Sequence, residues 1–199
     1  MNKLYADSQK IAEWAPSMHG VLSKADLQSL LADPQPNSFF RRLRSLEAAS
    51  VLTRAGRGFY VTKDGSLFAL SQRLCERSYI SFDNVLSEAL VVGTRPVHQV
   101  MAVKVGPSRD YRTRAGRIVH LGVDDELFFG FATRDGISYA LPEKALLDVL
   151  YFHVRGRRFP FDIYSDLNLA PLGQERLAGF VQRYKNPRFV TFVENLLRG

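Results

Sequence analysis

The residues best suited to chemistry in this chain are the arginines of the segment 37–61, where a helical pattern runs into a glycine-bearing turn. At about 100° per residue, the apolar side chains of Phe39, Leu43 and Leu46 share one helix face. The opposite face carries guanidinium groups and small side chains, namely Arg41, Arg44, Ser45 and Ala48. Because guanidinium groups bind phosphates and guanine edges, the segment predicts a helix that fits the major groove of DNA. A solvated basic helix packed on a small sheet is the alternative.

The segment after this helix predicts a short β-hairpin. Gly56 and Gly58 tolerate positive φ and separate two β-forming runs, 51–53 and 59–61. A hairpin directly after a basic helix is typical of the wing of a winged helix-turn-helix. The expected DNA-contacting residues of the helix and wing are Ser38, Arg41, Arg42, Arg44, Ser45, Arg54, Arg57 and Lys63.

The start of the chain predicts the remaining helices of such a unit. Apolar residues recur at helical spacing in 4–15, and Ser23 is placed to cap a second helix. The basic helix is expected to begin at Asn37 or Ser38, whose side-chain oxygens can accept from first-turn amides. We therefore predict that residues 1–65 form a winged helix-turn-helix domain.

Residues 66–199 predict a second domain of mixed composition. Runs rich in β-branched and aromatic residues are found at 97–105, 112–113, 117–121 and 127–133. Helices are expected from Leu67, from a cap at Ser81 to about Leu90, from Pro142, and near Pro171 and Pro187. We expect a small antiparallel or mixed sheet packed with helices, so that the fold class of the whole chain is α+β.

Composition favours a globular chain with polyanionic partners. The chain has 199 residues, a formal net charge of +7 and a pI near 9.7, which suits two small domains that attract nucleic acid more than a membrane surface. With Cys75 as the single cysteine, no intrachain disulfide can form. The chain shows neither a secretion signal nor an apolar run near the roughly 20 residues that span a bilayer, so we expect a cytoplasmic protein.

A second group of basic residues lies in the strand-rich region: Lys104, Arg109, Arg112, Arg114 and Arg117. Asp110 is the acidic residue among them, and Arg155–Arg158 adds further charge. Taken singly, such runs are usually solvated surfaces. Together with the basic wing, they suggest that the second domain extends the DNA-facing surface through additional phosphate contacts.

The chain does not display an enzyme's residue pattern. Glu143 and Lys144 point about 100° apart on a helix, whereas Lys144 and Asp148 are spaced for an ion pair. The acidic run 124–126 indicates a solvated turn rather than a metal site, because three consecutive strand residues cannot all face inward. We therefore expect no catalytic residue, metal ligand or cofactor.

Two other functions remain open from the residues. One is a nuclease or nucleotidyltransferase that a winged helix targets to nucleic acid. The other is a ligand-responsive regulator that holds a metabolite among the aromatic residues Phe128, Phe129, Phe131 and Tyr139. Such aromatic residues more often fill a core.

Several fragments resemble the AbiEi-type antitoxins of type IV, abortive-infection toxin-antitoxin systems. They are Leu52–Tyr60, Tyr79–Ser81 with Ala89–Leu90, and Pro142–Asp148, the last being the most specific. The resemblance covers most of residues 20–150. It implies an N-terminal winged helix that represses its own operon, with DNA contacts at Arg41, Arg44, Arg54 and Arg57.

The same resemblance implies a C-terminal domain that counteracts a nucleotidyltransferase-like toxin encoded alongside, without requiring direct contact between the two proteins. This chain departs from the family in its short C-terminal end. The expected partners are double-stranded DNA with repeated half-sites, on which two copies pair, and the toxin as a functional partner. No membrane partner is expected.

Overall fold

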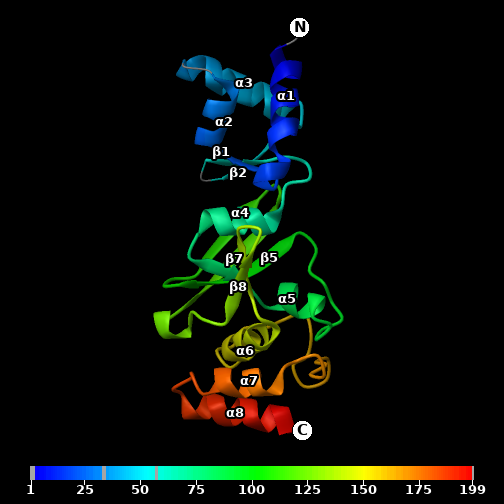
Figure 1. Ribbon diagram of the computed structural model, residues 1–199, viewed down its shortest axis with the longest axis vertical. Helices are drawn as coiled ribbons and strands as arrows, with labels where there is room; N and C mark the ends of the chain where they lie inside the picture. The colour runs from blue at the N-terminus through cyan, green and yellow to red at the C-terminus, as the bar shows by residue number, and fades with distance from the viewer. Residues whose placement is uncertain (1–2, 33–34, 57, 199) are drawn as a thin grey trace.

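The computed structural model describes residues 3–32, 35–56 and 58–198 as an elongated α+β protein, which confirms the expected fold class (Figure 1). The N-terminal helices lie at one end and the C-terminal helix at the other. The N-terminal unit contains α1 (Lys3–Trp14), β1 (Val21–Ser23), α2 (Lys24–Leu31), α3 (Pro36–Ala48), β2 (Thr53–Gly56) and β3 (Phe59–Val61). No helix of the described residues is both long and apolar enough to cross a membrane.

The three helices of the N-terminal unit pack around one apolar cluster. Ser23 caps α2 as expected, in a reciprocal capping box with Asp26. The predicted start of α3 was wrong, because its N-cap is Gln35, and no side-chain capping hydrogen bond is found there within the described residues. Pro36 occupies the first helical position, where its missing amide costs no hydrogen bond, so the helix begins before Asn37.

The three-stranded antiparallel sheet of the N-terminal unit has the order β1-β3-β2 and buries residues on both faces. Leu22 and Tyr60, which are cross-strand partners, belong to the helical cluster. Val21 and Val61, one position along each strand, belong to the core of the rest of the chain. Because successive strand residues point to opposite faces, the sheet is shared between two cores.

The second unit consists of α4 (Leu67–Leu74), β4 (Ser78–Ile80), α5 (Asp83–Glu88), β5 (Gln99–Val105), β6 (Arg109–Thr113), β7 (Gly116–Val123), β8 (Phe131–Arg134), β9 (Ile137–Ala140), α6 (Pro142–His153), α7 (Gln174–Val181) and α8 (Pro187–Arg198). Its sheet is mixed and has the order β6-β7-β5-β4-β9-β8, with β5–β7 and β4–β9 parallel. Strands β4 and β9 were not expected.

The predicted cap at Ser81 was also wrong. Helix α5 begins at Asp83 and follows Phe82, whereas the Ser81 hydroxyl donates to Asp148 at 2.7 Å. Tyr79 donates to the same carboxylate at 3.2 Å. Asp148 forms the predicted ion pair with Lys144, but both side chains are buried in the core rather than exposed. The hydroxyl groups of Tyr79 on β4 and of Ser81, just after β4, thus help to satisfy a buried charge of α6.

Opposite faces of the six-stranded sheet carry different helices. The Ser71 hydroxyl of α4 is hydrogen-bonded to His120 of β7 at 2.8 Å, whereas Tyr79 contacts α6 on the other face. His120 is fully buried, and its Nδ1 has no hydrogen-bond partner among the described residues. Burial, with the nearby charge of Lys104, lowers the pKa of His120 to about 4.

We expect His120 to make folding stability depend on pH. The pKa in the folded protein lies below the ordinary value, so stability is fully present above about pH 6.5 and is lost as pH falls toward 4. The loss from this group is at most about 3 kcal/mol. Urea denaturation of the wild type and His120→Gln between these pH values measures it. A variant as acid-sensitive as the wild type would contradict the assignment.

Candidate nucleic-acid interface

Helix α3 presents the predicted basic face to solvent. Phe39, Leu43 and Leu46 are buried in the core, which confirms the amphipathic pattern. Arg41 and Arg44 are exposed, and neither forms an ion pair or hydrogen bond through its side chain with a residue that the structure describes. The remaining members of this face are exposed small residues, Ser45 and Ala48. The Ser45 hydroxyl donates to the carbonyl of Arg41 at 3.1 Å, within the helix.

Arg42 does not belong to this face. Its Nε donates to Asp7 at 2.8 Å, and its Nη2 donates to the other oxygen of the same carboxylate at 2.5 Å. A third donation reaches the carbonyl of Leu31 at 3.0 Å. With its side chain 11% exposed, Arg42 holds α3 against α1 and the end of α2. Arg42, which was expected to contact DNA, is thus held by Asp7. The two residues are 35 positions apart in the chain, so local spacing could not show this pairing.

The hairpin β2–β3 follows α3 as expected, although its first strand begins at Thr53 rather than Val51. Gly56 and Gly58 have φ values of +85° and +79°, which confirms the need for glycine at this turn. Arg54 is exposed on β2, and the exposed Lys63 follows β3. Of the other expected contacts, Ser38 is half-buried in the first turn of α3, and Arg57 lies outside the described residues.

The second basic group divides into residues near the hairpin and residues away from it. Arg112 and Arg114 line a groove of about 600 Å³ together with Arg54 of β2. Arg109 stands opposite His120 in the β6–β7 register, at the far end of β6 from the hairpin turn. The Lys104 ammonium donates to the carbonyl of Val105 at 2.6 Å. The structure therefore brings two of the five predicted residues to the wing.

Arg117 is engaged by a carboxylate. It donates to both oxygens of Asp110, at 2.6 and 3.1 Å. The hydrogen bond from Arg117 holds the pKa of Asp110 below its usual value, with smaller contributions from the charges of Arg112 and Arg157. Asp110 is therefore charged at neutral pH and partly neutralises this end of the sheet.

The passage from the N-terminal unit to α4 is held by close backbone contacts. Thr62 donates its amide to the carbonyl of Gly20 at 2.9 Å. A Cβ on Gly20 would lie 2.5 Å from Cα of Gly65, so only glycine allows the two segments to cross here. Arg73 of α4 donates to the carbonyl of Val21 at 2.8 Å and to Asp26 at 2.7 Å. These contacts fix the second unit against the N-terminal sheet.

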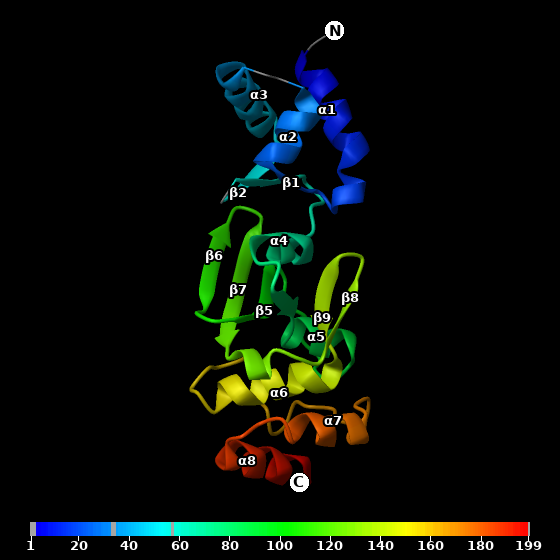
Figure 2. The same ribbon diagram turned by 60° about the vertical axis from the view of Figure 1, so that its left-hand side comes forward.

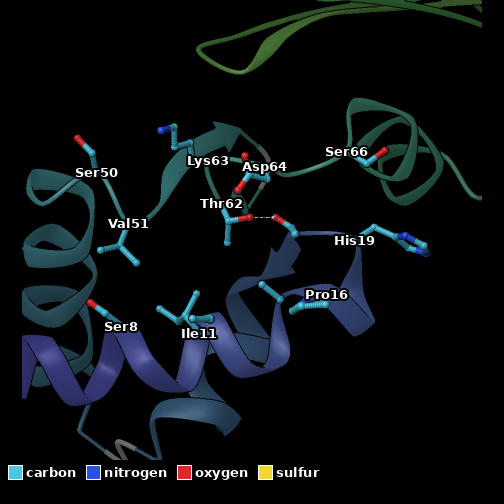
Figure 3. A pocket seen from close by; sticks show the side chains of 13 residues that line it. Ser8, Ile11, Pro16, His19, Ser50, Val51, Thr62, Lys63, Asp64 and Ser66 are labelled. Carbon is cyan, nitrogen blue, oxygen red and sulfur yellow. Dashed lines mark hydrogen bonds between the residues drawn. The ribbon is translucent and has the colours of Figure 1, made fainter.

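A pocket of about 590 Å³ lies beside this crossing, between α1, the turn after α3 and the segment after β3 (Figure 3). Ile11 and Pro16 come from the α1 side, and Val51 comes from the turn. Lys63 and Asp64 lie across the pocket from Ile11. The helix side of the lining is thus mainly apolar, with the hydroxyl of Ser8 among its members, and the other side carries one charge of each sign.

The acidic and aromatic residues that could indicate a metal or metabolite site have partners within the protein. In the acidic run, Asp125 pairs with Arg77, and Glu126 accepts from Lys185 at 2.6 Å. The aromatic rings of Phe128 and Phe131 lie 5.2 and 4.9 Å from that of Tyr79 and pack, partly buried, against the core. Within the described ranges, no group of three or more His, Cys, Asp or Glu side chains is arranged to hold a metal ion.

Comparison with known proteins gives a likeness in fold. No family model and no curated protein matches the chain. Among solved structures, the crystal structure of the RV2827C protein from Mycobacterium tuberculosis is similar, with a TM-score of 0.58 and 15% sequence identity. The match covers 90% of this chain and 71% of that chain. At this identity the likeness shows a shared fold and carries no activity to this chain.

The two uses of arginine on α3 predict stability effects of very different size when the residues are substituted. Arg42→Met leaves the buried carboxylate of Asp7 without its partner and should lower the free energy of unfolding by about 3 kcal/mol. Arg44→Met removes an exposed guanidinium group and should change it by less than about 0.5 kcal/mol. Urea denaturation of both variants measures the difference. Equal stabilities would contradict the role assigned to Arg42.

Proposed function

We propose that this protein binds double-stranded DNA through residues 1–65, folded as a winged helix-turn-helix, and represses its own operon. In this arrangement α3 enters the major groove and the hairpin β2–β3 lies beside it as the wing. The order of helix, strand, two helices and hairpin supports the proposal. The proposal includes no catalytic activity.

The observation that carries the proposal is the exposed face of α3. Arg41 and Arg44 stand there without a carboxylate partner among the described residues, next to the small residues Ser45 and Ala48. Small side chains let a helix backbone approach a groove, and the two guanidinium groups then reach base edges or phosphates. The ion pair of Arg42 with Asp7 fixes the helix in the orientation that presents this face.

We further propose that the protein is the antitoxin of a type IV system, acting in the cytoplasm against a nucleotidyltransferase-like toxin. The resemblance of three fragments to AbiEi-type antitoxins supports this role. Two of these fragments meet in the core, where Tyr79 and Ser81 donate to Asp148. These two fragments therefore help to hold the second unit together, and we propose that the surface of this unit counteracts the toxin.

A co-expression experiment tests the antitoxin role separately from DNA binding. A nucleotidyltransferase gene next to this one should arrest growth when expressed alone, and co-expression of the full chain should restore growth. The Arg41→Ala/Arg44→Ala variant should restore growth equally well, because the role belongs to the second unit. Growth arrest that the wild type cannot relieve would contradict the role.

Mobility shifts on the DNA immediately upstream of the gene test repression. Contact with about six phosphates predicts a slope of about −5 for log affinity against log salt. Each of Arg41→Ala and Arg44→Ala should lower affinity by about 5- to 150-fold, corresponding to about 1–3 kcal/mol for a base contact. Arg188→Ala, at an exposed arginine of α8, is the matched control.

Two copies should bind half-sites spaced by a helical turn of about 10.5 base pairs.

The same mobility shifts can contradict the proposal in two ways. A wild type that binds neither the upstream duplex nor one of unrelated sequence is not a DNA-binding protein. Equal affinity of the wild type and both alanine variants would show that α3 does not contact DNA.

A further inference from the structure

A polar groove joins the N-terminal unit to the second unit on one side of the molecule. Its lining includes Glu47 of α3, Arg54 of β2, and Arg112 and Arg114 at the end of the hairpin β6–β7. Strands β2 and β6 are in contact across it. Helix α3, β2 and β6 lie along the same side of the molecule in Figure 2.

The guanidinium groups of this groove have no direct side-chain partner within the described part of the protein, although the charge of Asp110 acts on Arg112. The side chains of Arg54, Arg112 and Arg114 form no hydrogen bond or ion pair with any residue that the structure describes, although Glu47 lies in the same lining. Arg112 also stands directly opposite Arg117 across β6–β7. Like charges at opposed positions of a sheet repel each other. The carboxylate of Asp110 offsets the charge of Arg117, to which it is hydrogen-bonded.

The arrangement suits an oxyanion shared between the two units. A phosphodiester accepts hydrogen bonds from guanidinium groups in bidentate geometry. Duplex DNA carries one charge per about 1.7 Å of its axis, so a duplex on α3 presents further phosphates to the adjoining surface. Because Gly20 and Gly65 cross in contact and Arg73 bridges the units, the groove keeps its shape without the ligand.

We infer that this groove is a phosphate-binding site for the backbone of the DNA duplex held by α3, with Arg112 and Arg114 as ligands from the second unit. The inference rests on the proposed DNA binding and extends it beyond residues 1–65. Phosphate contacts position a duplex without reading its bases. The site therefore adds affinity and fixes the orientation of the duplex, and sequence preference belongs to α3.

Mobility shifts across a salt series test the site, using the upstream duplex and a duplex of unrelated sequence as probes. Arg112→Gln/Arg114→Gln should make the salt slope shallower by about 1 to 2, since each lost phosphate contact contributes about 0.9. Affinity should fall by the same factor on both duplexes, so that their ratio is unchanged. The matched control, Arg109→Gln/Arg188→Gln, removes the same charge from exposed positions outside the groove and should retain the wild-type slope.

The outcomes separate the two proposals. A groove variant that melts at the wild-type temperature and binds DNA with the slope of the control would overturn the phosphate site alone. A change in the affinity ratio of the two duplexes would also overturn it, because the site would then read sequence. A wild type that binds neither duplex would overturn the proposed function and this inference together.

Discussion

The three-stranded sheet of the N-terminal unit buries both of its faces, and this shared burial sets the relation between the two halves of the protein. Leu22 and Tyr60 face the helices, whereas Val21 and Val61 face the second unit. Burying an apolar side chain of this size contributes about 1.5–3 kcal/mol, so separating the units would expose a substantial part of the core. Any surface that spans the units therefore keeps its geometry.

The arginines of this chain serve two purposes, and the distance to a carboxylate decides which. Arg42 and Arg117 each hold a carboxylate with two hydrogen bonds and stabilise their own surroundings. Arg44 and Arg112 stand on exposed surface without such a partner among the described residues. A positive net charge alone does not distinguish these cases, because the distinction lies in pairs such as Arg42 and Asp7 that only the fold brings together.

Patterns that depend on neighbouring residues were predictable from the sequence. The buried face of α3, the Ser23 cap and the glycines of the hairpin follow from spacing and backbone preference. Features that depend on distant partners were not. Strands β4 and β9 are short and paired in parallel, and Ser81 looked like a helix cap because its actual partner, Asp148, lies 67 residues away. The groove at Arg112 likewise required the packing of two units.

Hydrogen exchange of the full chain, with and without the upstream duplex, tests most directly whether one side of the molecule contacts DNA. Protection is expected in α3, in the hairpin β2–β3 and at the β6–β7 turn, with α7 and α8 unchanged. Protection that spares residues 36–48, or that appears in the C-terminal helices instead, would contradict the account.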